Sequence, residues 1–337
     1  MTAHPKVDPL RNRMVGWTWR AGADLVRGKP SVSPLDTRPL LHVNEWDENF
    51  QPAPAVSPEE EEIEGEEIIT WSNPTSHLPL VKEGTHLLLS NTAVAPHDFS
   101  FTRRHYLFVE NRLQGNTLPY ILGKKCPAEC VDLQPRQDML LHLLRRPAAA
   151  VTSASTSTPK KGDREGQRAG DVLTVPLSPG FTIHSVNAWE HTPSSSSSPS
   201  PSSDSENEEE EDKGDVCVSL LTTAWEGAYV RSGKVKGGLL GAWEGRAPLF
   251  DDIPPTLLYR SIVRLSNSNS NRGKNENDGK GKIGKMEAEL VSHGPVDGME
   301  NIIVEHPHIN PAYEGREVRW VFMSVGSQTG VSSPPLG

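Results

Sequence analysis

The sequence predicts an all-β fold, and three observations support this class. Short segments rich in Val, Ile, Leu, Tyr and Trp recur along the chain, and several of them alternate apolar with polar residues. Gly, Pro, Asn or Asp punctuate most of these segments. The one helix-like segment, residues 137–146, fits a strand that enters a loop equally well. Many short strands with turn residues between them are typical of a sandwich, a barrel or a propeller.

Eight segments are predicted as strands because each is short, apolar and bounded by turn residues. In chain order they are residues 85–94, 105–113, 181–191, 216–225, 257–265, 285–292, 301–306 and 318–325.

Four other segments have too little apolar surface to offset the entropy of ordering them. They are Pro-rich, acidic, Ser-rich or Asn/Gly-rich, and comprise residues 52–67, 148–170, 192–215 and 266–284. We interpret them as disordered insertions in a single domain that covers residues 1–326, followed by a disordered tail at residues 327–337. The serine and acidic run within 192–215 is either a plain solvated loop or a phosphorylated one.

The composition excludes several classes of protein. The formal net charge is -10, with 44 acidic against 34 basic residues and no basic stripe, which argues against a nucleic-acid partner. The three cysteines, Cys126, Cys130 and Cys217, are too few for a disulfide framework, and the first two have no second pair to complete a metal site. No apolar stretch approaches the roughly 20 residues of a membrane helix, and the sequence shows no signal peptide.

Three of the twelve histidines stand out because each lies at the edge of an apparent strand: His4, His97 and His184. A closed β-architecture can bring strand ends that are distant in sequence to one point. His306 and His308, which flank a proline, could form half of another site. From the pattern alone, each of these histidines could equally be a surface or hydrogen-bonded residue.

The residues around these histidines form motifs. His4 lies in Ala-His-Pro-Lys, His97 in Pro-His-Asp-Phe-Ser-Phe-Thr, and His184 in Phe-Thr-Ile-His-Ser-Val-Asn-Ala-Trp-Glu. Residues 304–311 read Val-Glu-His-Pro-His-Ile-Asn-Pro, and residues 118–130 and 315–322 read LPYILGKKCPAEC and GREVRWVF. In this order, the motifs resemble those of the carotenoid cleavage oxygenases, a family of non-haem iron enzymes.

The resemblance implies part of a seven-bladed β-propeller, with long disordered loop insertions. It implies Fe(2+) bound by His4, His97 and His184, whose near nitrogens would lie within roughly 4 Å of one another. Glu305 would hydrogen-bond the ring of His184 and thereby fix its tautomer.

The same resemblance implies a dioxygenase that uses O2 to cleave one conjugated double bond of a carotenoid or apocarotenoid. It also implies peripheral membrane contact through an apolar patch that the sequence does not locate, and a plastid or cytoplasmic location. The aromatic residues Phe99, Phe101 and Trp189 would either line the substrate tunnel or pack in the core.

The chain also departs from the family pattern. The family has a long region before the first ligand and a fourth histidine near its C-terminus, whereas here three residues precede His4 and no such histidine follows. Position 306 is His where the family usually has Phe. We therefore expect a chain cut at both ends. Two alternatives to an active enzyme follow: a catalytically impaired relic that acts as a non-catalytic metal-binding or interaction protein, or an unrelated β-sandwich binding module.

Overall fold

The computed structural model describes the residues that form the sheets and the loops next to them. These residues are 4–21, 39–50, 86–89, 92, 94–116, 118–126, 130–147, 171–193, 215–232, 254–267 and 286–327. The predicted insertions at 52–67 and 148–170, nearly all of those at 192–215 and 266–284, and the tail from 328 onward lie outside them. Ser266 and Asn267 belong to a strand, so the last insertion was predicted to begin too early.

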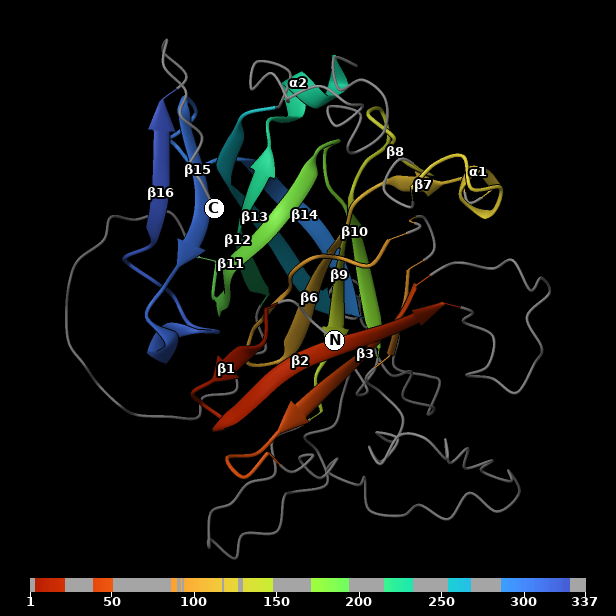
Figure 1. The fold of residues 1–337 in the computed structure, drawn as a ribbon. Helices are drawn as coiled ribbons and strands as arrows, with labels where there is room; N and C mark the ends of the chain where they lie inside the picture. Colours follow the sequence, from red (N-terminus) through yellow and green to blue (C-terminus); the bar gives the residue numbers. More distant parts are fainter. Residues whose placement is uncertain are drawn as a thin grey trace, which may run out of the picture.

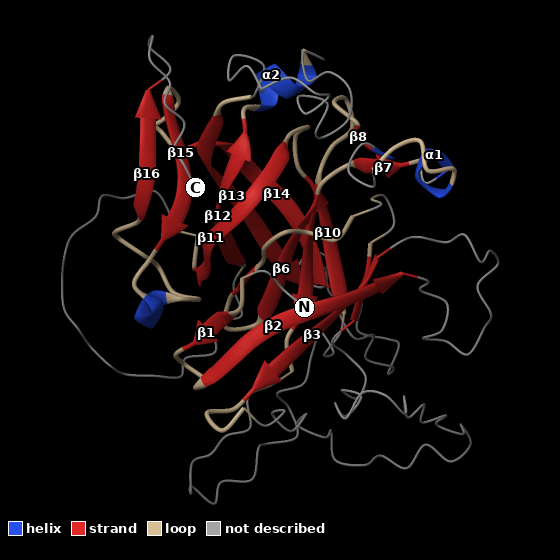
Figure 2. Ribbon diagram, in the orientation of Figure 1, coloured by secondary structure: helices blue, strands red, loops and turns tan. Residues whose placement is uncertain are grey.

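The described residues form mostly antiparallel sheets, and helix is confined to short turns (Figure 2). The first sheet has the order β1 (Lys6–Asp8), β2 (Arg13–Ala21), β3 (Pro39–Trp46) and β4 (His86–Leu88). The second has the order β10 (Val172–Pro176), β9 (Leu140–Arg145), β6 (His105–Glu110) and β5 (Ser100–Phe101). The third has the order β11 (Phe181–His191), β12 (Val216–Trp225), β13 (Thr256–Asn267) and β14 (Met286–Pro295).

Two smaller sheets complete the described fold. One pairs β15 (Ile302–His308) with β16 (Phe322–Ser327), and the other pairs β7 (Leu113–Gly115) with β8 (Val131–Leu133). The short helical elements are α1 (Leu118–Ile121), α2 (Gly227–Arg231) and the 3-10 turn η6 (Pro311–Tyr313).

Apolar side chains fill the spaces between neighbouring sheets. One core cluster joins the first and second sheets, a second joins the second and third sheets, and a third joins the third sheet to the β15–β16 pair. Because the second and third sheets are covered on both faces, β6 is buried along its whole length and β12 along all but its two end residues. A strand that is buried on both faces need not alternate apolar with polar residues, and neither of these strands does.

Four strands that lie at the edge of their own sheets, β1, β5, β11 and β15, contain or lie next to His4, His97, His184 and Glu305. Strand β11 contacts both β5 and β15, and β1 contacts η6. Figure 1 shows β1 near β11, and Lys6 of β1 bonds the backbone of Ser185 on β11. Residues that come from distant parts of the sequence therefore approach one another at the ends of these edge strands.

The predicted strands agree with the observed ones in the second half of the chain. Strands β11 and β12 have the predicted bounds, and β13, β14 and β15 differ from prediction by a few residues. The segment 137–146 contains a strand, β9, so its helix-like appearance was misleading. Strands β1, β2, β3, β5, β8 and β10 were not predicted, and β4 is much shorter than the predicted segment 85–94.

Candidate metal centre

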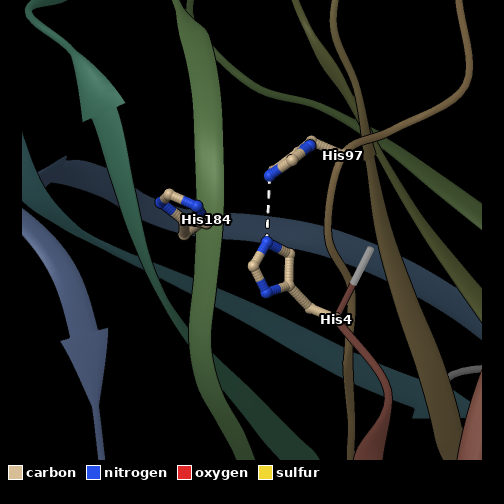
Figure 3. Close-up of side chains that lie close together, drawn as sticks. All are labelled: His4, His97 and His184. Atoms are coloured by element: carbon tan, nitrogen blue, oxygen red, sulfur yellow. Dashed lines mark hydrogen bonds between the residues drawn. The ribbon is translucent and has the colours of Figure 1, made fainter. Parts of the chain in front are cut away.

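The structure brings His4, His97 and His184 together. His4 lies two residues before β1, His97 lies in the loop that leads into β5, and His184 is part of β11. Figure 3 shows the three rings pointing toward one another from these separate elements. The packing of separate sheets against one another therefore places three imidazoles close together, although His4 and His97 are 93 residues apart in the sequence.

The geometry of the three rings is that of a compact cluster. The ring centroids are 4.8, 5.1 and 5.2 Å apart, and each pair of rings meets edge to face. The Nε2 atoms of His4 and His97 are 2.9 Å apart. One nitrogen from each of the three rings lies within 4.8 Å of the others, a little wider than the expected separation of about 4 Å.

Local strand geometry positions His184. The pairing of β11 with β12 changes register between Thr182 and His184 and again between Ser185 and Asn187. Such irregularities bend a strand and re-aim its side chains. The backbone N–H of His184 donates to Oγ1 of Thr223 on β12, at 3.3 Å. These features direct His184 out of the regular sheet and toward the other two rings.

Glu305 on β15 holds the ring of His184. Its Oε2 lies 2.7 Å from Nδ1 of His184 and also accepts the backbone N–H of His306 at 2.9 Å. Its Oε1 accepts the hydroxyl of Thr223 at 3.1 Å. A carboxylate that accepts from Nδ1–H fixes the tautomer in which Nε2 is unprotonated. The nitrogen of His184 that a metal could use is therefore Nε2.

The surroundings shift the pKa values of His97 and His184 in opposite directions. Partial burial, followed by the neighbouring rings of His4 and His184, lowers the pKa of His97. Burial acts against the charged form of His184, but the hydrogen bond and the charge of Glu305 outweigh it, so the pKa of His184 is raised. The pKa of Glu305 is lowered because bonds from His184 and His306 outweigh its burial.

The donor set fits a divalent transition metal. Imidazole nitrogen suits Fe(II), Zn(II) and Co(II), and a hydrogen-bonded carboxylate behind one ligand is the usual support for such a site. Among the described residues, His306 and His308 are not part of the cluster, although the ring of His306 lies 6.4 Å from that of His184. His306 has a positive φ of 52°, an uncommon conformation for a residue other than glycine.

Other residues of the motifs have structural roles. Phe99 and Phe101 are buried in the cluster between the first and second sheets, and Trp189 is buried in the cluster against β15, so all three pack in the core. The side chain of Asn187 is fully buried. It accepts the N–H of Gly315 and donates to the carbonyls of Tyr313, the last residue of η6, and of Arg316.

Sequence reasoning missed Thr223, which bonds Glu305 and the backbone of His184. No motif marks it, because it lies in the middle of an ordinary buried strand.

Comparisons with known proteins identify the family to which the chain belongs. The model of the RPE65 family, described as retinal pigment epithelial membrane protein, matches residues 1–334. The chain belongs to this family of carotenoid oxygenases. Apocarotenoid-15,15'-oxygenase of Synechocystis is 29% identical over 94 residues, which are 28% of this chain and 15% of that protein.

Solved structures of the same family share the fold. A chimera of Synechocystis apocarotenoid oxygenase (ACO) and RPE65 has a TM-score of 0.50 at 16% identity, covering 98% of this chain and 44% of the chimera. The cobalt-substituted Synechocystis ACO has a TM-score of 0.50 at 16% identity, covering 99% of this chain and 46% of that one. This likeness confirms a β-propeller architecture. The chain spans less than half the length of these solved relatives.

Proposed function

We propose that this chain carries the metal centre of a non-haem Fe(II)-dependent dioxygenase-like protein of the carotenoid oxygenase family. The observation that supports this most directly is the convergence of His4, His97 and His184, with Glu305 behind one ring. The likeness to apocarotenoid oxygenases supports a carotenoid or apocarotenoid as substrate. When bound, Fe(II) would supply activation of O2, which consumes one conjugated double bond and leaves two carbonyl products.

The residues of the chain have distinct tasks in this proposal. The three imidazoles bind the metal as neutral donors, which leaves positions open for small molecules and requires no carboxylate ligand. Glu305 holds the proton on Nδ1 of His184, so Nε2 stays available, and its negative charge makes that nitrogen a stronger donor. Thr223 orients Glu305 through its hydroxyl.

Metal binding and product analysis test the proposal together. The purified chain, titrated anaerobically with Fe(2+) or Co(2+), should bind about one ion, and His184→Ala should abolish this binding. His308→Ala is the matched control because His308 is an exposed histidine of β15 outside the cluster. Incubation of the Fe(2+)-loaded chain with an apocarotenoid and O2 should give aldehyde products by chromatography. Binding without products would favour the non-catalytic metal-binding protein instead, and no binding would refute the centre.

A peripheral membrane contact is the second part of this proposal, and α1 is the surface that supports it. Helix α1 lies away from the large sheets, beside β7 and β8 (Figure 1). Three apolar side chains of α1, Leu118, Tyr120 and Ile121, are more than half exposed, as is Leu122 directly after it. Exposed Lys124 and Lys125 follow. Apolar residues with basic neighbours suit insertion at a lipid surface. No helix in the described part of the chain is long and apolar enough to span a membrane.

Vesicle sedimentation tests this surface. The double variant Ile121→Ser/Leu122→Ser should lose binding to vesicles of phosphatidylcholine and phosphatidylglycerol. Phe50→Ser removes an equally exposed apolar side chain elsewhere and should leave binding unchanged. Equal binding of both variants would show that α1 is not the contact.

A further inference from the structure

Two side chains hold the backbone of Ser185, the residue after His184. They come from the segments that contain His97 and His4. The backbone N–H of Ser185 donates to Oδ2 of Asp98 at 2.8 Å. Its backbone C=O accepts from Nζ of Lys6 at 2.8 Å. Asp98 directly follows His97, and Lys6 lies two residues after His4. The backbone of one residue, Ser185, therefore links all three segments that carry the histidines.

This arrangement uses a property of edge strands. Strand β11 is an edge strand, so alternate residues turn their backbone N–H and C=O groups away from β12 and have no strand to bond them. Ser185 and Asp98 are buried, and the side chain of Lys6 is only 10% exposed. Buried backbone groups require partners, and at Ser185 two side chains supply them in place of a strand.

The other contacts of the two side chains fix their positions. Oδ1 of Asp98 accepts the N–H of Phe99 at 2.7 Å, so both oxygens of this carboxylate are used and its orientation is set by its own loop. The ammonium of Lys6 also lies 3.8 Å from Oε1 of Glu314, which follows η6. The bulged part of β11 around His184 and Ser185 is thus bonded to Asp98 and Lys6 at once.

We propose that Asp98 and Lys6 are positioning residues of the metal centre. By bonding the backbone N–H and C=O of Ser185, an arrangement called the clamp below, they hold the three histidines in place before a metal binds. This inference rests on the proposed metal-binding function. The clamp restricts movement of the His184 segment relative to the other two segments, so the protein does not have to order the rings when the ion arrives. A change in a residue that holds a ligand in place typically weakens metal binding about 10 to 100-fold.

Two variants remove one side of the clamp each. In Asp98→Asn, only one oxygen remains, so the side chain cannot accept from both Phe99 and Ser185 and turns an amide N–H toward one of them. Lys6→Met keeps the aliphatic stem and removes the donor, whereas Lys6→Arg keeps a donor. Glu110→Gln is the matched control because it alters a fully buried carboxylate of the second sheet. Glu110 bonds His142, which is not one of the three clustered histidines.

The experiment measures Co(2+) affinity by competition with a chromophoric chelator, the thermal midpoint of the metal-free protein, and hydrogen–deuterium exchange of the peptide that contains Ser185. Asp98→Asn and Lys6→Met should each weaken Co(2+) binding by at least tenfold and accelerate exchange at Ser185 in the metal-free protein, and Lys6→Arg should restore most of the affinity. Glu110→Gln should lower the thermal midpoint without changing the affinity.

The outcomes separate the clamp from the metal centre itself. Wild-type protein that binds Co(2+) through His184, together with clamp variants that bind equally tightly, overturns the clamp and leaves the metal centre intact. Wild-type protein that binds no Co(2+) overturns the metal centre and the clamp with it. A loss of affinity in Glu110→Gln as large as that in Asp98→Asn shows that general destabilisation is the cause, and also overturns the clamp.

Discussion

Replacing Glu305 with Gln separates the charge of this residue from its shape. The carboxylate has three donors: Nδ1–H of His184 and the N–H of His306 on Oε2, and the hydroxyl of Thr223 on Oε1. In Glu305→Gln, the amide oxygen can take the place of Oε2 and accept both N–H groups. The amide NH2 then faces the oxygen of Thr223, which can accept as well as donate. Every polar group keeps a partner, and only the negative charge is lost.

The expected magnitudes follow from this inventory. Loss of charge behind a ligand imidazole should weaken metal binding about 10 to 100-fold, or about 1.4 to 2.8 kcal/mol. The free energy of unfolding of the metal-free protein should change by only about 1 kcal/mol, because no hydrogen bond is left unmade. Glu305→Ala should instead destabilise the fold by several times this amount, since it leaves the donors of His184, His306 and Thr223 without their acceptor.

The assay compares the dissociation constant for Co(2+) with the urea midpoint of the metal-free protein for wild type, Glu305→Gln and Glu305→Ala. Glu289→Gln serves as the control, because Glu289 is an exposed carboxylate on β14, 3.7 Å from Arg264. The reasoning is refuted if Glu305→Gln binds Co(2+) as tightly as wild type, or if it destabilises the fold as much as Glu305→Ala.

Three further predictions concern stability. Burial would raise the pKa of Glu190, but bonds from His105 and Thr102 and the charge of Arg104 lower it to about 2. The stability that this carboxylate contributes is present above pH 4.5 and is lost as the pH falls toward 2. Glu190→Gln should therefore lower the free energy of unfolding by about 3 kcal/mol at pH 7 and flatten the acid side of the curve of stability against pH. Arg146→Met removes the buried cation that bonds Asp8 and Glu45, to which Arg11 and Arg13 are the remaining partners, and should cost about 3 kcal/mol by urea denaturation; an unchanged midpoint would contradict this. Gly315→Ala places a Cβ 3.0 Å from a buried phenylalanine ring at a φ of +77°, so it should cost about 1–3 kcal/mol, and an unchanged midpoint would contradict this.

The strands were predictable where they are long and apolar, and were missed where they are short or mixed in composition. Strands β11 and β12 are long, apolar and bounded by polar segments, so their bounds are visible in the sequence. Strand β2 was missed because it mixes Arg13, Gly16 and Thr18 with its apolar residues, and only part of it faces the core. Strands β1 and β5 have three and two residues, too few for any periodic pattern.

The site could be predicted only through its motifs. Nothing in the spacing of His4, His97 and His184 indicates that they meet, because their proximity depends on how whole sheets pack side by side. The contact between Glu305 and His184 was likewise inferred from family resemblance, and the structure contains it. Their joint role as a metal centre stays a prediction.

The structure divides its polar residues into two sets that act on different properties. Arg146 and Glu190 connect whole sheets. Arg146, for example, bonds Asp8 at the end of β1, Glu45 of β3, and the carbonyl of Thr102, which follows β5. Their loss is expected to lower the stability of the fold.

Glu305, Asp98 and Lys6 all bond His184 or Ser185 in the bulged part of β11, where apolar cores already hold the sheets on both sides. Because the cores hold the sheets without them, these residues can change the arrangement of the histidines at small cost to the fold. Metal affinity and stability should therefore vary independently in this protein. A pair of variants such as Asp98→Asn and Glu190→Gln should show opposite profiles, the first losing Co(2+) affinity and the second losing stability.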